Sequence, residues 1–139
     1  IPSTLIVLRD SQYIPQPVKL FEIGEVVTRC TDCYTGWQNQ LNVVFAIMDS
    51  EIRFEDTHAD LFSVLFELGI SSELKIERCS HKAFLSGRCG CVKYGDVVVG
   101  VVGEMHPEIL TALGIEYPVS MAELYLNKLK PVLSAVKFM

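Results

Sequence analysis

Five cysteines are the side chains of this sequence best suited to hold a metal ion. Cys30 and Cys33 are separated by two residues, a spacing at which zinc sites commonly take two thiolates. Cys89 and Cys91 share one face of a predicted strand, about 6.5 to 7 Å apart, which is a cramped spacing for a metal. These four thiols, with Cys79 as a fifth, form one candidate zinc site. The alternative is that they are small buried apolar side chains.

The number and spacing of the cysteines also indicate the redox setting. The count is odd, no regular pairs recur, and 139 residues are enough to bury a core without disulfides. Structural disulfides are rare in reducing compartments. We therefore expect no disulfide framework and a cytoplasmic location.

The three histidines are candidate acids, bases or metal ligands, namely His58, His81 and His106. None has a partner at a spacing typical of catalysis. His106 directly precedes Pro107, which favours the first turn of a helix, so His106 is expected to cap that helix. We expect His58 in the exposed first turn of another helix.

Arg88 and Glu104 are the charged pair with the most suggestive positions. Arg88 follows Gly87 and precedes a strand, so it either contacts a ligand or partner or ties a loop to a carboxylate. Glu104 ends a predicted buried strand, where a carboxylate needs a partner, and Arg88 is the obvious candidate. Neither Gly-x-Gly-x-x-Gly nor Gly-x-x-x-x-Gly-Lys occurs, so no phosphate-binding loop is predicted.

The stretch 97–110 organises the elements that must position these side chains. Residues 97–104 are dense in valine without polar alternation, which predicts a strand covered on both faces. Gly100 and Gly103 mark points where another backbone approaches closely. Pro107 starts a short helix that Gly114 ends.

The rest of the chain alternates strands and helices. The helix from Asp56 or Thr57 to Leu68 is expected to bury one apolar face, and Gly69 ends it. Gly95-Asp96 predicts a two-residue hairpin turn. The predicted strands are 18–27, 41–48, 74–78, 89–94, 97–104 and 119–126, with a helix in 1–10, a long hairpin connection over 28–39, a loop over 80–88 and a tail over 127–139; the buried helix positions are Leu61, Phe62, Leu65, Phe66 and Leu68. This order predicts a single α+β domain, residues 1–139, with an antiparallel β-sheet and flanking helices.

Composition narrows the class of partner. Half of the residues are hydrophobic, and 17 acidic residues outnumber 12 basic ones, for a net charge of −5. Binding to nucleic acid depends on basic residues that neutralise phosphates, so direct binding of RNA or DNA is not expected. No apolar run approaches the roughly 20 residues of a membrane helix, so no membrane partner is expected. The first ten residues show no signal peptide, and we expect a piece of a longer chain.

Four motifs in one order carry a family resemblance. They are Lys19-Leu20-Phe21-Glu22-Ile23-Gly24-Glu25-Val26-Val27, Phe84-Leu85-Ser86-Gly87-Arg88-Cys89, Gly100 to Leu110, and Leu113-Gly114-Ile115 through Pro118 to Glu123-Leu124. The chain resembles the C-terminal, catalytic-like core domain of the phenylalanyl-tRNA synthetase β subunit, of the archaeal and eukaryotic type. The residues of the motifs with structural roles are Gly87, Arg88, Gly103, Glu104, His106 and Pro107. The loop over 30–39 departs from the family pattern.

The resemblance implies a class II aminoacyl-tRNA synthetase-like fold that has lost its active site. In the family the α subunit binds ATP with Mg²⁺, phenylalanine and the tRNA acceptor end, and the β domain packs against it in an (αβ)₂ assembly. The implied partners are therefore the α subunit and other β-subunit domains, with tRNA reached only through the holoenzyme. This domain would hold no cofactor and no catalytic or substrate-binding residue. The sequence agrees, because the Gly-x-Gly-x-Gly-x-x-Arg strand of class II active sites does not occur and no predicted strand carries the Arg-x-Glu motif. The pattern Arg-x-Glu occurs only at Arg53-Phe54-Glu55, in the predicted connection before a helix.

Two functions follow from these observations. The first is a non-catalytic structural and assembly domain of a phenylalanine-tRNA ligase that charges tRNA as a holoenzyme. The alternative is a stand-alone interaction or regulatory module of the same fold, stabilised by zinc through Cys30, Cys33, Cys89 and Cys91. An independent small-molecule enzyme ranks last, because no acid, base and nucleophile are suitably spaced.

Overall fold

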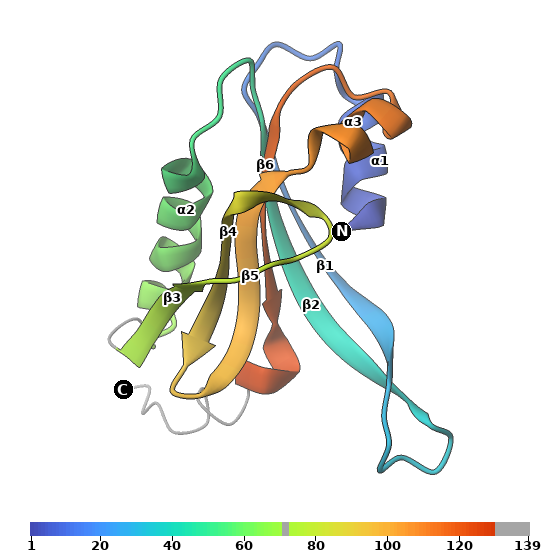
Figure 1. Cartoon of the computed structure of the whole chain (residues 1–139), viewed down its shortest axis with the longest axis vertical. Helices are drawn as coiled ribbons and strands as arrows, with labels where there is room; N and C mark the ends of the chain where they lie inside the picture. Colours follow the sequence, from blue (N-terminus) through green and yellow to red (C-terminus); the bar gives the residue numbers. More distant parts are fainter. Residues whose placement is uncertain (71–72, 130–139) are drawn as a thin grey trace.

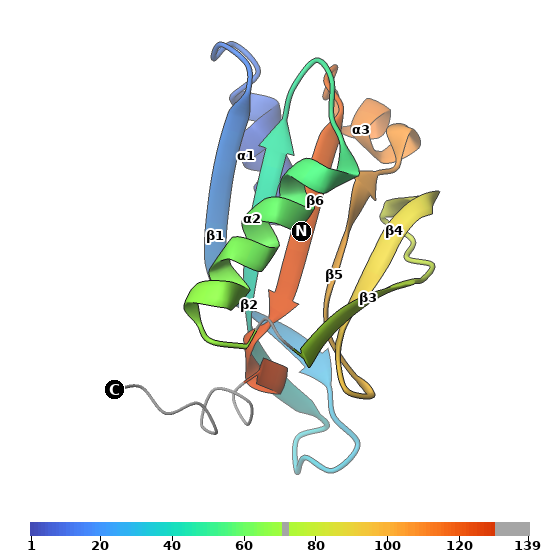
Figure 2. The ribbon, with the colours of Figure 1, turned by 90° about the vertical axis from the view of Figure 1, so that its left-hand side faces the viewer.

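A six-stranded antiparallel sheet carries helices on both of its faces (Figures 1 and 2). This computed structural model describes residues 1–70 and 73–129. Helix α2 covers one face of the sheet, and α1 and α3 lie against the other. The elements are α1 (Pro2–Asp10), β1 (Val18–Arg29), β2 (Trp37–Met48), α2 (Phe54–Glu67), β3 (Leu74–Arg78), β4 (Phe84–Tyr94), β5 (Val97–Met105), α3 (Pro107–Leu113) and β6 (Val119–Tyr125). The predicted α+β class is confirmed.

The strand order is β1-β2-β6-β5-β4-β3, so β6, the last of the described strands, lies in the middle of the sheet. Its Ala122 is opposite Phe45 of β2 and also opposite Val102 of β5. Because β5 and β6 are paired on both sides and covered on both faces, most of their residues are buried. The prediction that β5 is covered on both faces is thus confirmed.

The sheet divides the apolar interior into two clusters, one beneath each helical layer. On the α1 and α3 face lie Leu5, Leu8, Val18, Val44, Ala46, Met48, Phe84, Cys89, Val101, Met105, Leu110, Ile115, Val119 and Met121. On the α2 face lie Val43, Leu61, Leu65, Ile70, Leu74, Val92, Val99, Val102, Ala122, Leu124 and Leu129. Strand side chains alternate between the faces, so each central strand contributes to both clusters.

Helix α2 differs from its prediction at its start and on its inner face. It begins at Phe54, after Arg53, whose backbone N–H donates to Asp56 Oδ2 at 3.4 Å. The prediction that Asp56 or Thr57 precedes the helix was therefore wrong, since both lie inside its first turn. Phe66, expected on the buried face, has 69% of its surface exposed.

The predicted loop over 80–88 is too long, because β4 already begins at Phe84. The hairpin turn after it is as predicted, with Gly95 at φ 60°. The α3 boundaries are also confirmed: Pro107 is its first residue, and Gly114 ends it in the left-handed conformation. Most of the predicted tail, residues 130–139, lies outside the described residues. Among those described, no helix is both long enough and apolar enough to cross a membrane.

Candidate functional site

The six motif residues singled out from the sequence lie where the first half of β4 pairs with the end of β5. Phe84 is opposite Met105 and Cys89 is opposite Gly103, so five steps along β4 match two along β5. The extra residues form a bulge in which Gly87 takes a φ of +81° that other residues rarely adopt. A Cβ on Gly103 would lie 2.7 Å from the Arg88 carbonyl oxygen. Gly103 therefore lets the bulge rest directly on β5, as the sequence predicted for close backbone approach.

The bulge places Arg88 over Glu104. Arg88 Nη1 donates to both carboxylate oxygens of Glu104, at 3.0 and 2.9 Å. The Arg88 side chain is 58% exposed, whereas that of Glu104 is 16% exposed. The expected pairing is confirmed, and it serves mainly to neutralise the half-buried carboxylate.

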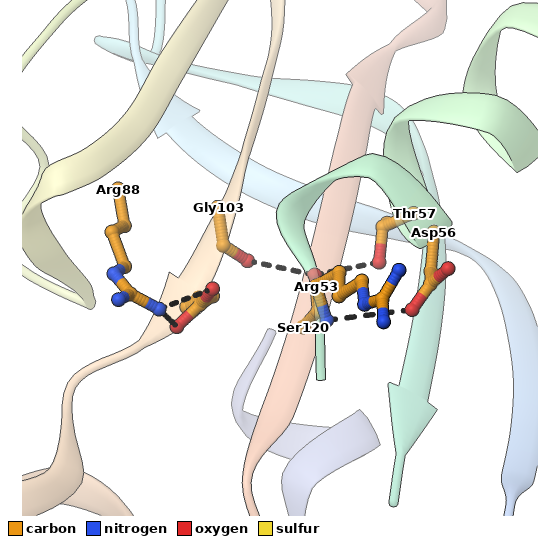
Figure 3. A network of polar contacts seen from close by, with 7 residues as sticks. Arg53, Asp56, Thr57, Arg88, Gly103 and Ser120 are labelled. Carbon is orange, nitrogen blue, oxygen red and sulfur yellow. Dashed lines mark hydrogen bonds and ion pairs between the residues drawn. The ribbon is translucent and has the colours of Figure 1, made fainter. Parts of the chain in front are cut away.

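Gly103 also connects this region to helix α2 (Figure 3). Its carbonyl oxygen accepts a hydrogen bond from the Ser120 hydroxyl at 3.3 Å. Thr57 Oγ1 in turn donates to Ser120 Oγ at 2.6 Å. Thr57 and Ser120 are both fully buried. The chain of hydroxyls therefore fixes the first turn of α2 over β6 and β5.

His106 closes the region on the other side. Its Nδ1 accepts from the Glu108 backbone N–H at 3.2 Å, so the predicted helix cap is confirmed. Its own backbone N–H donates to the Ala83 carbonyl at 2.9 Å. The imidazole and its backbone thus hold α3 and the start of β4 together.

The other histidines lie on separate elements. His58 is the fifth residue of α2 and half-buried, so the expected position in an exposed first turn was wrong. Its ring stacks on that of Phe62, with ring centroids 4.5 Å apart. His81 precedes β4, and its Nδ1 accepts from the Ala83 backbone N–H at 3.2 Å. The structure does not gather the three histidines into one site.

The cysteines separate into two groups. Cys30 and Cys33 form a disulfide in the β1–β2 turn. Cys79 is bonded to Cys91 beside β4, and the Cys89 sulfur lies 3.6 Å from that of Cys79. The candidate zinc site would take ligands from both pairs, and these lie in two separate places. The prediction of no disulfide framework was wrong, because this structure contains both disulfides. No group of three or more His, Cys, Asp or Glu residues within 1–70 and 73–129 is arranged to hold a metal.

The electrostatics of Cys89 are those of a core residue. Burial raises the pKa of its thiol. A thiol with a raised pKa stays protonated near neutral pH and is a poor nucleophile. Cys89 therefore packs in the apolar cluster and is not activated for chemistry.

Sequence reasoning missed two polar features. Asn42 Nδ2 donates to Glu123 Oε1 at 2.9 Å between the paired strands β2 and β6. A hollow of about 500 Å³ lies beside the Arg88–Glu104 pair, lined in part by Arg53 and Arg78. The sequence held a signal for the hydrogen bond, because Asn42 is a polar residue within the predicted apolar strand 41–48. It held no signal for the hollow, because the arginines that line it are far apart in sequence.

Comparison with known proteins places these features in a family. Residues 1–126 match the family described as the phenylalanyl tRNA synthetase beta chain CLM domain. The phenylalanine–tRNA ligase beta subunit of Sulfurisphaera tokodaii is 39% identical over 133 residues, 96% of this chain and 24% of that protein. The corresponding subunit of Saccharolobus solfataricus is 36% identical over 93% of this chain and 23% of its own length. The chain thus spans about a quarter of these curated relatives.

Solved structures with the same fold are more distant in sequence. Two structures of pyrrolysyl-tRNA synthetase from Desulfitobacterium hafniense superimpose with TM-scores of 0.72 and 0.68, at 17% and 16% identity. Each covers 97% of this chain, which spans about half of the solved chains (48% and 49%). The predicted class II synthetase-like fold is therefore confirmed. Because the family match covers nearly the whole chain, this chain belongs to the CLM domain family of the phenylalanyl-tRNA synthetase β chain.

Proposed function

We propose that the chain is a non-catalytic structural and assembly domain, the catalytic-like core of a phenylalanine-tRNA ligase β subunit. In this proposal ATP, Mg²⁺ and phenylalanine bind to a separate α subunit, and the two subunits form an (αβ)₂ assembly. A position towards the C-terminal end of the parent β subunit belongs to the same proposal. Sequencing the coding region on either side of residues 1–139 tests that position.

The observation that carries the proposal is the uncovered apolar surface of the edge strand β1. Phe21, Ile23 and Val27 lie on one face of β1 and are 70%, 58% and 64% exposed. Among the described residues, strand β1 pairs only with β2, so its outer backbone edge is unpaired within that part of the chain. Edge strands that are long and apolar favour association with another chain. This surface is therefore our candidate for contact with the α subunit.

The motif residues support the non-catalytic half of the proposal. Arg88 and Glu104 bind each other, and His106 caps α3. The contacts of these side chains join β4, β5 and α3, which is a structural task.

Association between subunits tests the apolar surface. In the full-length β chain, co-expressed with its α subunit, Phe21→Asp and Ile23→Asp together are expected to lower affinity for α at least tenfold. Charges at the centre of an apolar interface are desolvated without a partner. Val97→Asp is the matched control, because Val97 is 51% exposed at the distant β4–β5 turn. Analytical ultracentrifugation measures the dissociation constants.

Equal affinities for the double variant, the control and the native chain would rule out β1 as the interface.

The zinc-stabilised alternative has no supporting contact in this structure, because its four thiols lie in two separate places. Metal analysis of the purified protein checks it separately: about one zinc per chain, with loss of stability on chelation, would favour that alternative.

A further inference from the structure

The hollow beside Arg88 and Glu104 lies on the α2 face of the sheet. Its floor comes from β3, β4 and β5, and its wall from the segment that leads into α2. Its volume is about 500 Å³, within the range of small-molecule sites. The residues that line it include Ile52, Arg53, Glu55, Ile76, Arg78, Gly87, Arg88, Gly90 and Glu104.

Three arginines from three separate segments line this hollow, against two glutamates. Arg88 is bound by Glu104. Within 1–70 and 73–129, neither Arg53 nor Arg78 forms an ion pair with a carboxylate. The chain as a whole carries a charge of −5, so a local excess of positive charge stands out. Guanidinium groups left without carboxylates are well suited to bind an external oxyanion.

Hydrogen bonds hold the segments around the arginines, and the register of β3 and β4 leaves room for a ligand. Gly90 is opposite Arg78 across the β3–β4 pair, so no side chain occupies the space beside Arg78 on β4. The Arg88 guanidinium is held by two hydrogen bonds to Glu104. The start of α2 is fixed by the Thr57–Ser120–Gly103 hydrogen bonds, as Figure 3 shows. Two apolar side chains, Ile52 and Ile76, line the same space.

We propose that this hollow binds one phosphate-type oxyanion, either free or as the end group of a small molecule. Arg78 and Arg88 hold the oxyanion, and Arg53 closes over it from the α2 side. Ile52 and Ile76 supply contact for the uncharged part of an organic phosphate. The site does not rest on the proposed assembly function, because β1 and its apolar surface lie at the opposite edge of the sheet.

Crystals of the full-length protein with its partner subunit locate the site directly. Arsenate is the probe for free phosphate, and 8-bromoadenosine monophosphate is the probe for an organic phosphate; both scatter anomalously. At 10 mM arsenate we expect a peak within hydrogen-bond distance of the Arg78 and Arg88 guanidinium groups. A bromine peak beside Ile52 and Ile76 would identify an organic phosphate, and arsenate alone would identify the free ion.

Variants show whether the arginines cause the binding. Arg78→Gln is expected to lower arsenate affinity at this position at least tenfold, since a charge-assisted contact is lost. Arg9→Gln is the matched control: it removes the same charge from α1, on the other face of the sheet, and should leave occupancy unchanged. The proposal is overturned by an empty hollow at 10 mM, by a peak that appears only above 100 mM (an adventitious ion only), or by a peak unaffected by Arg78→Gln.

Discussion

At the scale of single residues, Gly103 is the most constrained position in the region between β4 and β5. Its missing side chain admits the Arg88 carbonyl, and its own carbonyl accepts from Ser120. Gly24, on β1, is a glycine of the opposite kind, because a Cβ there would meet nothing within 4 Å. Alanine variants at these two positions therefore distinguish the steric effect of an added Cβ from the intrinsic effect of replacing glycine in a strand.

Gly103→Ala is expected to lower the free energy of unfolding by about 1 to 3 kcal/mol, because backbone must move to admit the methyl group. Gly24→Ala should leave it unchanged or raise it by about 0.5 kcal/mol, since alanine loses less entropy on folding. Urea titration of both variants provides the measurement. Similar effects at the two positions would show that the close contact at Gly103 relaxes without cost.

Arg88→Ala is expected to lower the free energy of unfolding by about 1 kcal/mol. The loss leaves Glu104, only 16% exposed, without its cation, while the exposure of Arg88 limits the effect. Arg9→Ala is the control, because Arg9 pairs with Asp10 at a site where both side chains are exposed. An effect at Arg88 no larger than that at Arg9 would make the Arg88–Glu104 pair a surface contact only.

Cys89 gives a pH dependence with a definite sign. Burial raises the pKa of its thiol above the ordinary 9.0, so the folded chain keeps a proton that the unfolded chain has lost. Stability from this group is complete below pH 9 and falls as the pH rises above it. Cys89→Ala should flatten the decline in stability between pH 8.5 and 10, measured by urea titration. An unchanged slope would mean that Cys89 does not contribute to it.

At the scale of elements, α2 is held to the sheet by a buried pair of hydroxyls as well as by leucines. Thr57→Val keeps the shape of the side chain but removes the hydrogen bond to Ser120. We expect about 1 to 2 kcal/mol of destabilisation, the usual effect of losing a buried hydrogen bond. Ser63→Ala is the control on the same helix, because its hydroxyl is exposed and bonds only to Ala59. Equal thermal shifts for the two variants would contradict a special role for the buried pair.

The elements that the sequence predicted well are those with local signals. Strand 74–78, the Gly95-Asp96 turn and the Pro107 helix each depend on residues within a few positions of one another. The start of α2 was misplaced because Asp56 resembles a cap, whereas it acts from inside the first turn. The β4 bulge was read as a loop, since Gly87 and Ser86 favour turns and the partner strand that pairs around them is distant.

The candidate site shows the same division between local and distant information. Arg88 and Glu104 were paired correctly, because a buried carboxylate after a valine strand demands a cation. The hydroxyl pair of Thr57 and Ser120 and the hollow near Arg53 and Arg78 were not predicted. They depend on the central position of β6 and on where α2 crosses the sheet. The spacing of residues within a short segment indicates neither. The exposure of Phe66 likewise depends on what covers α2.

At the scale of the whole molecule, the sheet has two unlike regions. Its central strands are covered on both faces, and the β4–β5 region is held together by its own motif residues. Its β1 edge leaves Phe21, Ile23 and Val27 exposed. A chain whose characteristic residues bind one another while its edge strand remains apolar is suited to assembly.

Activation of phenylalanine with ATP is the most direct test of this account. The measurement is ATP–pyrophosphate exchange by the full-length β chain alone, by the α subunit, and by their complex. We predict no phenylalanine-dependent exchange by the β chain alone, full exchange by the complex, and a loss in the Phe21→Asp and Ile23→Asp complex that excess α subunit restores. Phenylalanine-dependent exchange by the purified β chain without α would contradict the account.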